Sequence, residues 1–276
     1  MSLFGWFGED ENVAQNVQKK QESDFSNFEL VTRYIYEKSG ITDLDTRALV
    51  SKHLKQYAQE NDCYTTASFL TKMQEDRSFY QEIINIVTVN ETYFFREIKE
   101  LEWLVSHIAQ KGGSFSILSM PCSSGEEVYS ILIMLSEANI DISTITLKGF
   151  DINSEAVARA KEGIYDERAL HKLPLHVKEK YFKLDDAGHY RILESLKSRA
   201  SFSQNNIFEL SSHHEHYDIV LSRNMFIYFD MQKRLHATEI IVNLLKHGGI
   251  YIKGHADHIT EHKSLQSVAF GVYKRV

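Results

Sequence analysis

Apolar side chains recur every three or four positions across residues 25–89, and this spacing predicts helices throughout the segment. One apolar stripe is Phe28, Val31 and Ile35, and a later one is Leu44, Ala48, Leu49 and Leu54. Breaks at residues 39–40 and 61–62 divide the pattern into several short helices. We therefore expect a small N-terminal helical domain at 25–89, preceded by a mobile polar tail at 1–24.

From residue 115 onward, short apolar runs alternate with helical stripes. The expected strands lie near 115–118, 144–151, 200–206, 217–222 and 249–255, with the segment 267–276 closing the sheet. This alternation predicts an α/β fold over 90–276, with a mostly parallel sheet and a ligand site outside the carboxyl ends of its strands.

The alternation breaks down over residues 164–199. Two runs with aromatic residues, at 181–182 and 189–192, flank the turn sequence Asp185-Asp186-Ala187-Gly188. Such a pattern predicts a hairpin. We place a small inserted antiparallel β subdomain at about 178–203.

A turn of small residues at 121–125 joins the first strand to the next helix, and Glu126 and Glu127 follow at once. Small side chains let a ligand approach the backbone, and the first amides of a helix can bind a polar group. The two carboxylates would repel a pyrophosphate but suit a cationic ligand or ribose hydroxyls. The same residues also fit a capping box, of Ser123 with Glu126 or of Ser124 with Glu127, that only starts the helix.

Further polar side chains follow the expected strands. Asp151 ends the second strand, where nucleotide-binding α/β folds hydrogen-bond ribose hydroxyls. Arg223, Asn224 and Tyr228 come directly after the fourth strand. We expect these residues to meet at one edge of the sheet.

The segment 90–96, before the first strand, sets three polar residues among aromatic ones: Asn90, Thr92 and Arg96. Aromatic packing would fix their positions near the ligand. Alternatively, Asn90 or Thr92 caps the following helix, and Arg96 is a surface cation.

In the predicted helical domain, Arg47, Ser51 and Lys55 follow one another at four-residue steps, with Lys52 beside them. This face could bind an acidic helical partner, or it could be a solvated surface.

Composition narrows the class of protein. The 276 residues are 43% hydrophobic and carry a formal charge of −7, which argues against a general nucleic-acid binder. No signal peptide or membrane-spanning run is recognisable, and Cys63 and Cys122 form no pair, so we expect a cytoplasmic protein. The histidines at 213, 214 and 216 lack the spacing and partners of a metal site, and we expect no bound metal.

Four parts of the chain, in order and register, resemble the CheR family of chemotaxis receptor methyltransferases. They are NETYFFRE (90–97), CSSGEEVYS (122–130), FDINSEAVARAKEGIY (150–165), and SRNMFIYF (222–229) with GGIYIKGHAD (248–257). The resemblance extends from about Phe25 onward. It departs at Ser124 and Val128, where relatives usually have Thr and Pro, and in GHAD, where they have GHSE.

The resemblance implies an S-adenosylmethionine-dependent enzyme with a Rossmann-like methyltransferase sheet, an N-terminal helical domain and an inserted antiparallel β subdomain. It implies methyl transfer to glutamate side chains of chemoreceptor cytoplasmic helices, giving methyl esters and S-adenosylhomocysteine. The family's cofactor contacts fall on Asn90, Thr92, Arg96, Glu127, Asp151, Asn206, Ile207, Arg223 and Asn224. Tyr228 matches a family tyrosine near the transferring methyl, so we expect Arg96 and Tyr228 to be catalytic.

A glutamate side chain is already ionised at neutral pH, so no strong general base is needed and the main task is alignment in a water-free site. Two other functions stay open at this point. A dinucleotide oxidoreductase would need more glycine after the first strand. A catalytically silent adaptor would keep the fold and bind receptors or an acidic partner through Arg47, Lys52 and Lys55.

Overall fold

The computed structural model describes residues 23–44, 47–210 and 215–276. Most of the tail expected at 1–24, and two of the three clustered histidines, His213 and His214, lie outside these residues.

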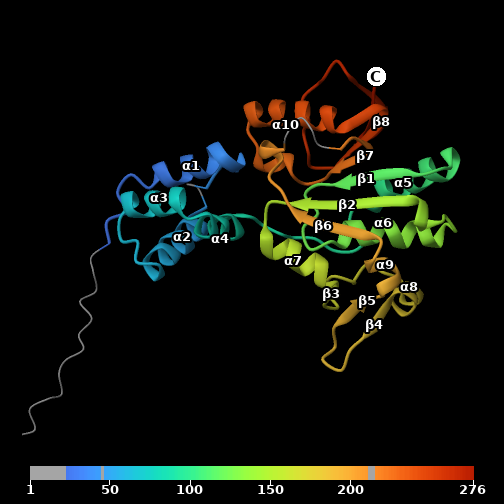
Figure 1. Cartoon of the computed structure of the whole chain (residues 1–276), viewed down its shortest axis with the longest axis horizontal. Helices are drawn as coiled ribbons and strands as arrows, with labels where there is room; N and C mark the ends of the chain where they lie inside the picture. The colour runs from blue at the N-terminus through green and yellow to red at the C-terminus, as the bar shows by residue number, and fades with distance from the viewer. Residues whose placement is uncertain (1–22, 45–46, 211–214) are drawn as a thin grey trace, which may run out of the picture.

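Four short helices form the first part of the described chain (Figure 1). They are α1 (Glu29–Ser39), α2 (Ala48–Glu60), α3 (Thr66–Glu75) and α4 (Arg77–Val87). Their ends follow local signals, since Gly40 closes α1 in the left-handed region, at φ 76°, and the side chains of Thr65 and Asp76 cap α3 and α4. The helices enclose a core of their own, which includes Val31, Ile35, Leu54, Phe69 and Ile83.

A seven-stranded sheet forms the centre of the remaining chain, in the order β6-β2-β1-β7-β8-β10-β9. The strands are β1 (Phe115–Ser119), β2 (Ile145–Asp151), β6 (Ala200–Gln204), β7 (Tyr217–Ser222), β8 (Leu245–Lys253), β9 (Leu265–Ala269) and β10 (Val272–Arg275). The first five in spatial order pair in parallel, whereas β10 is antiparallel to both β8 and β9. The mostly parallel sheet predicted from the sequence is therefore confirmed.

Helices cover both faces of this sheet. Successive side chains of a strand point to opposite faces, so each strand contributes to two cores. Ile117 and Ile219 belong to the core shared with the covering helices α5 (Ile98–Lys111), α6 (Glu126–Glu137) and α7 (Ser154–Glu162). The next residues in the same strands, Leu118 and Val220, pack in the core formed with α10 (Met231–Leu244). Three short 3-10 helices, η1 (Ile142–Thr144), η2 (Ile207–Glu209) and η3 (Phe226–Tyr228), complete the connections.

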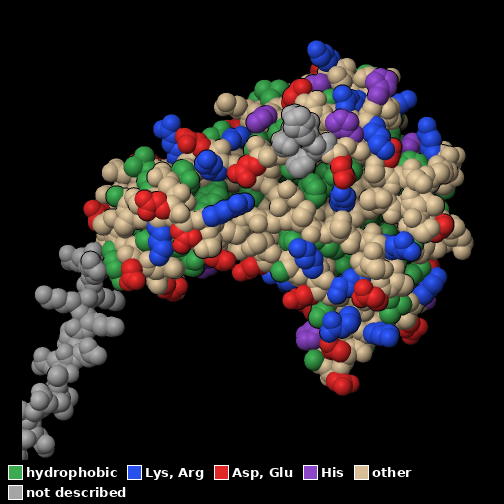
Figure 2. Space-filling view, in the orientation of Figure 1, with side chains coloured by type: hydrophobic (Ala, Val, Ile, Leu, Met, Phe, Trp, Pro, Cys, Tyr) green, Lys and Arg blue, Asp and Glu red, His purple; other side chains and the backbone are tan. Residues whose placement is uncertain are grey.

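A separate three-stranded antiparallel sheet interrupts the α/β alternation. It consists of β3 (Ile164–Tyr165), β5 (Tyr190–Ile192) and β4 (Phe182–Leu184), with α8 (Leu175–Tyr181) and α9 (Glu194–Lys197) beside it. This sheet starts earlier in the chain than the expected range of 178–203, because the residues that follow α7 pair with β5. The range also included β6, which belongs to the large sheet. The insertion projects from the body of the molecule, and a broad indentation separates it from the helical part (Figures 1 and 2).

Two boundaries differ from the sequence pattern. The strand expected at 249–255 begins earlier, at Leu245, directly after α10 ends at Leu244, and Gly248 lies inside this strand, β8, with φ 78°. The segment 267–276, expected to close the sheet, lies at its edge, but the edge begins at Leu265 and is the hairpin of β9 and β10, which turns at Gly271. Pairing of β8 with β7, and of β10 with β8, extends the sheet through these residues, and a local pattern does not contain these contacts.

Candidate active site

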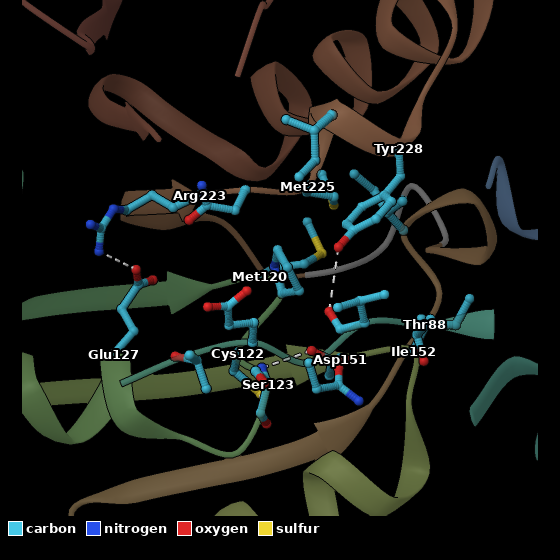
Figure 3. A pocket seen from close by; sticks show the side chains of 18 of the residues that line it. Thr88, Met120, Cys122, Ser123, Glu127, Asp151, Ile152, Arg223, Met225 and Tyr228 are labelled. Atoms are coloured by element: carbon cyan, nitrogen blue, oxygen red, sulfur yellow. Dashed lines mark hydrogen bonds and ion pairs between the residues drawn. The ribbon is translucent and has the colours of Figure 1, made fainter. Parts of the chain in front are cut away.

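A pocket opens at the carboxyl ends of β1, β2 and β7, beside the segment that connects α4 to α5 (Figure 3). Every residue expected to bind the cofactor or to act in catalysis lines it: Asn90, Thr92, Arg96, Glu127, Asp151, Asn206, Ile207, Arg223, Asn224 and Tyr228. Helix α5 begins at Ile98 with Glu97 at its N-cap position. Asn90 and Thr92 therefore do not cap that helix, and the structure favours the pocket interpretation of the segment 90–96.

The turn after β1 is held by backbone bonds to both neighbouring strands. The Met120 N–H donates to the Leu221 carbonyl and the Cys122 N–H donates to the Phe150 carbonyl. The N-cap residue of α6 is Gly125, at φ 91°. Neither capping box expected at this helix start is present, because a glycine has no side chain with which to cap.

Asp151 is almost fully buried at the end of β2. Its carboxylate accepts the backbone N–H of Ser123 at 2.7 Å and that of Asn153 at 2.9 Å. Burial raises the pKa of Asp151 to about 6, while these N–H groups act in the opposite direction. An ionised carboxylate has about four lone-pair positions. Asp151 can therefore accept further hydrogen bonds from a ligand.

Arg223 lies at the centre of an ion network on the other side of the pocket. Its guanidinium donates to Glu127 Oε2 at 2.5 Å and to Glu97 Oε2 at 3.4 Å, and also to the Arg96 carbonyl oxygen. Burial by itself would lower the pKa of Arg223, but the two carboxylates outweigh it and raise the pKa. Glu127 also accepts the Ser119 hydroxyl. These two contacts fix the Glu127 carboxylate in the lining of the pocket.

Tyr228 stands at the mouth of the pocket with arginines nearby. The Arg47 guanidinium lies 5.6 Å from the centre of the Tyr228 ring. Arg96 donates to the backbone carbonyl of Glu91 and lies 5.9 Å from the ring centre of Tyr93. Burial raises the pKa of Tyr228, and the charges of Arg47 and Arg96 act against this shift.

The three cations expected to bind a partner have different surroundings. Lys52 on α2 is exposed. The Lys55 ammonium lies 4.7 Å from the ring centre of Phe28, so it covers the core of the helices. Arg47 precedes α2 and is turned toward Tyr228, with its Nη1 atom buried and without a hydrogen-bond partner. The three side chains therefore do not form one exposed, positively charged surface.

Sequence reasoning missed most of the apolar wall of the pocket, which includes Met120, Ile152, Met225, Ile227 and Val89. The signal was available for the first three, because each follows a predicted strand directly or within three residues. An apolar residue at such a position can line a pocket or belong to the core. Its spatial neighbours decide between the two, and the sequence does not give them.

Among the described residues, two groups need a separate comment: the Cys122 thiol as a nucleophile, and one cluster of acidic and histidine side chains as a metal site. Burial raises the pKa of the Cys122 thiol well above its usual value, which keeps it from acting as a nucleophile. Glu97, Glu100 and His255 could together offer ligand atoms within 4.8 Å of one another. However, Glu97 is paired with Arg223, and Glu100 is paired with His255. The ion pair of Glu97 with Arg223 and the hydrogen bond between Glu100 and His255 account for this cluster.

A mostly parallel sheet, with an acidic pocket at its carboxyl edge and one glycine in the first turn, has the architecture of an S-adenosylmethionine-dependent methyltransferase. Residues 90–273 match the family model described as CheR methyltransferase, SAM binding domain. The chain belongs to this family, and S-adenosylmethionine is its cofactor.

Named relatives agree with this assignment. Chemotaxis protein methyltransferase 2 of Vibrio cholerae is 32% identical over 88% of this chain and 88% of its own length. Chemotaxis protein methyltransferase of Campylobacter jejuni is 34% identical over 83% of this chain and 87% of its own. The probable biofilm formation methyltransferase WspC of Pseudomonas putida is 30% identical over 82% of this chain but 55% of its own length. Within the described residues, no helix has the length and apolar character needed to cross a bilayer.

Proposed function

We propose that this methyltransferase acts in the cytoplasm on chemoreceptors, transferring the methyl group of S-adenosylmethionine to glutamate side chains on their cytoplasmic helices. The products are glutamate methyl esters and S-adenosylhomocysteine. One observation supports the proposal most strongly. Residues that lie far apart in the sequence, and that match the motifs of the CheR family, line a single pocket at the carboxyl edge of the sheet.

The donors and acceptors of the pocket fit this cofactor. Asp151 keeps lone pairs for the ribose hydroxyls, and the buried Ser123 hydroxyl has no partner within the protein. Glu127 supplies negative charge for the cationic methionine end. The apolar side chains of Ile152 and Ile207 offer a surface for the flat adenine ring. We assign the remaining cofactor contacts to Asn90, Thr92, Arg96, Asn206, Arg223 and Asn224.

Catalysis then depends on orientation. When bound, S-adenosylmethionine supplies a methyl group that is already activated for transfer. Arg96 orients a carboxylate at the mouth of the pocket, through the paired N–H groups of its guanidinium. The Tyr228 ring covers the site and presents its face to positive charge. The protein moves no proton, because the attacking glutamate is ionised at neutral pH.

The helical part provides the surface for the receptor. Arg47 reaches the pocket mouth, Lys52 is exposed on α2 and Lys55 lies on the same helix. Of these three cations Lys52 is the exposed one, and its charge complements the carboxylates of an incoming receptor helix, with an attraction that added salt would screen.

The test incubates the full chain with methyl-labelled cofactor and a receptor cytoplasmic fragment, then measures methanol released by base. Glutamate esters release labelled methanol under base, whereas methylated amines do not. Labelled receptor without released methanol would refute glutamate esterification. Cofactor binding without any transfer would favour the silent adaptor.

Variants of the two expected catalytic residues refine the test. Arg96→Ala and Tyr228→Phe should reduce methyl transfer more than they reduce affinity for S-adenosylhomocysteine, because both lie at the mouth of the pocket. Arg33→Ala and Tyr64→Phe are matched controls, since Arg33 and Tyr64 lie outside the pocket, and they should behave like the wild type. Equal losses of binding and transfer would contradict the catalytic assignment.

A further inference from the structure

The segment that follows β7 carries three of the proposed functional residues, Arg223, Asn224 and Tyr228, so its backbone position sets the geometry of the pocket. Asn224 adopts a left-handed conformation, at φ 61°, which costs energy for a residue other than glycine unless surrounding contacts fix it. A partner that fixes the backbone of this segment would therefore also fix the geometry of the pocket.

That partner is Asp257, from the loop after β8, which is fully buried. Its Oδ2 atom accepts the Asn224 N–H at 2.5 Å and the Gly254 N–H at 3.1 Å. Its Oδ1 atom accepts the Phe226 N–H at 2.8 Å. One carboxylate thus binds three backbone donors from two loops. Two of these donors lie within the functional segment.

The packing around this carboxylate leaves little room. A side chain at Gly254 would place its Cβ atom 2.8 Å from Asp257 Oδ2 and 2.9 Å from the Asn224 nitrogen. The Lys253 ammonium donates to the Asp257 carbonyl at 2.8 Å, which anchors the loop from outside. The two loops therefore meet in close contact through the Asp257 carboxylate.

We propose that Asp257 is a positioning residue for methyl transfer: its carboxylate fixes the backbone of residues 224–226 and thereby places Arg223 and Tyr228 in the pocket. Asp257 does not line the pocket. The inference rests on the proposed roles of Arg223, Asn224 and Tyr228. It adds a residue that acts only through them.

The substitution Asp257→Asn tests this role. Asparagine has the same shape but carries one carbonyl oxygen, so its amide N–H₂ faces at least one of the backbone donors. We expect kcat for transfer to a receptor fragment to fall about tenfold or more, since displacements near 1 Å can cost this much. The Kd for S-adenosylhomocysteine should rise as well, because Asn224 moves.

Asp218→Asn is the matched control, since Asp218 lies near the other end of β7. Its carboxylate accepts the Ser116 N–H and the Lys246 ammonium, each at 2.8 Å, away from the pocket. This variant should lower Tm without changing kcat or Kd. Gly254→Ala should reproduce the losses of Asp257→Asn, because its new methyl group displaces the same backbone.

The outcomes separate the two claims. If Asp257→Asn lowers Tm but keeps wild-type kcat and Kd, as expected for Asp218→Asn, then Asp257 is only structural and the inference is overturned. If Asp257→Asn does not fold, Gly254→Ala decides, and wild-type kcat and Kd in that variant overturn the inference. If the wild type itself transfers no methyl group, the proposed function fails, and the role of Asp257 is decided by the Kd alone.

Discussion

Burial of the Glu126 carboxyl group lowers the free energy of unfolding by an amount that depends on pH. It lies in the first turn of α6, where one oxygen accepts the Ser124 hydroxyl at 2.9 Å and the other is buried without a partner. Burial raises its pKa from 4.5 to about 7. The folded chain therefore keeps the proton of Glu126 at pH values where the unfolded chain has lost it.

The sign and size of the effect follow from this difference. Below about pH 4.5 the group is protonated in both states and costs nothing. As pH rises toward 7 the unfolded state gains stability by ionising, so the free energy of unfolding falls. At about 1.36 kcal/mol per pKa unit, the full penalty above pH 7 is about 3 kcal/mol. Roughly 2.5 kcal/mol of it develops between pH 5 and pH 8.

The substitution Glu126→Gln removes this titration and nearly keeps the shape of the side chain. We expect the free energy of unfolding of the variant, relative to the wild type, to rise by about 2 to 3 kcal/mol from pH 5 to pH 8. Urea unfolding without cofactor, at both pH values, measures it. Glu155→Gln, in the first turn of α7 but exposed, is the matched control. A constant difference between Glu126→Gln and the wild type at both pH values would refute the reasoning.

Three further predictions concern the pocket and the receptor surface. Glu127→Gln should weaken binding of S-adenosylhomocysteine, because Arg223 loses a charged partner and the pocket loses negative charge. Calorimetry measures the affinity, and an unchanged value would contradict the role of Glu127. Gly149→Ala should lower the free energy of unfolding by about 1 to 3 kcal/mol, since its Cβ atom would lie 2.7 Å from the Phe202 ring. Thermal unfolding measures this, and an unchanged stability would show that the ring can move. Lys52→Glu should raise KM for a receptor fragment at low salt and leave Tm unchanged, and an effect that persists at high salt would argue against an electrostatic role.

Some features of the site depended on contacts that no local pattern describes. Glu97 and Asp257 lie within the motifs that resemble the CheR family, yet nothing in their spacing indicates that they bind the segment after β7. Arg47 and Lys55 fit one helical face by spacing, but Arg47 lies beside Tyr228 of η3 and Lys55 lies beside Phe28, the residue before α1. A charged side chain is directed by the groups that surround it, and these come from other parts of the chain.

The sequence alone determined the helical character of residues 25–89 and the order of the parallel strands along the chain, because hydrophobic periodicity reports which face of a helix or strand is buried. It also placed Asp151 and Arg223 at strand ends, and parallel strands bring such ends to one edge. Only the tertiary structure decided where α10 ends, how the antiparallel sheet is bounded, and which carboxylate fixes the backbone beside the pocket. Those outcomes depend on pairing and packing between residues distant in sequence, and a local sequence pattern contains no information about such contacts.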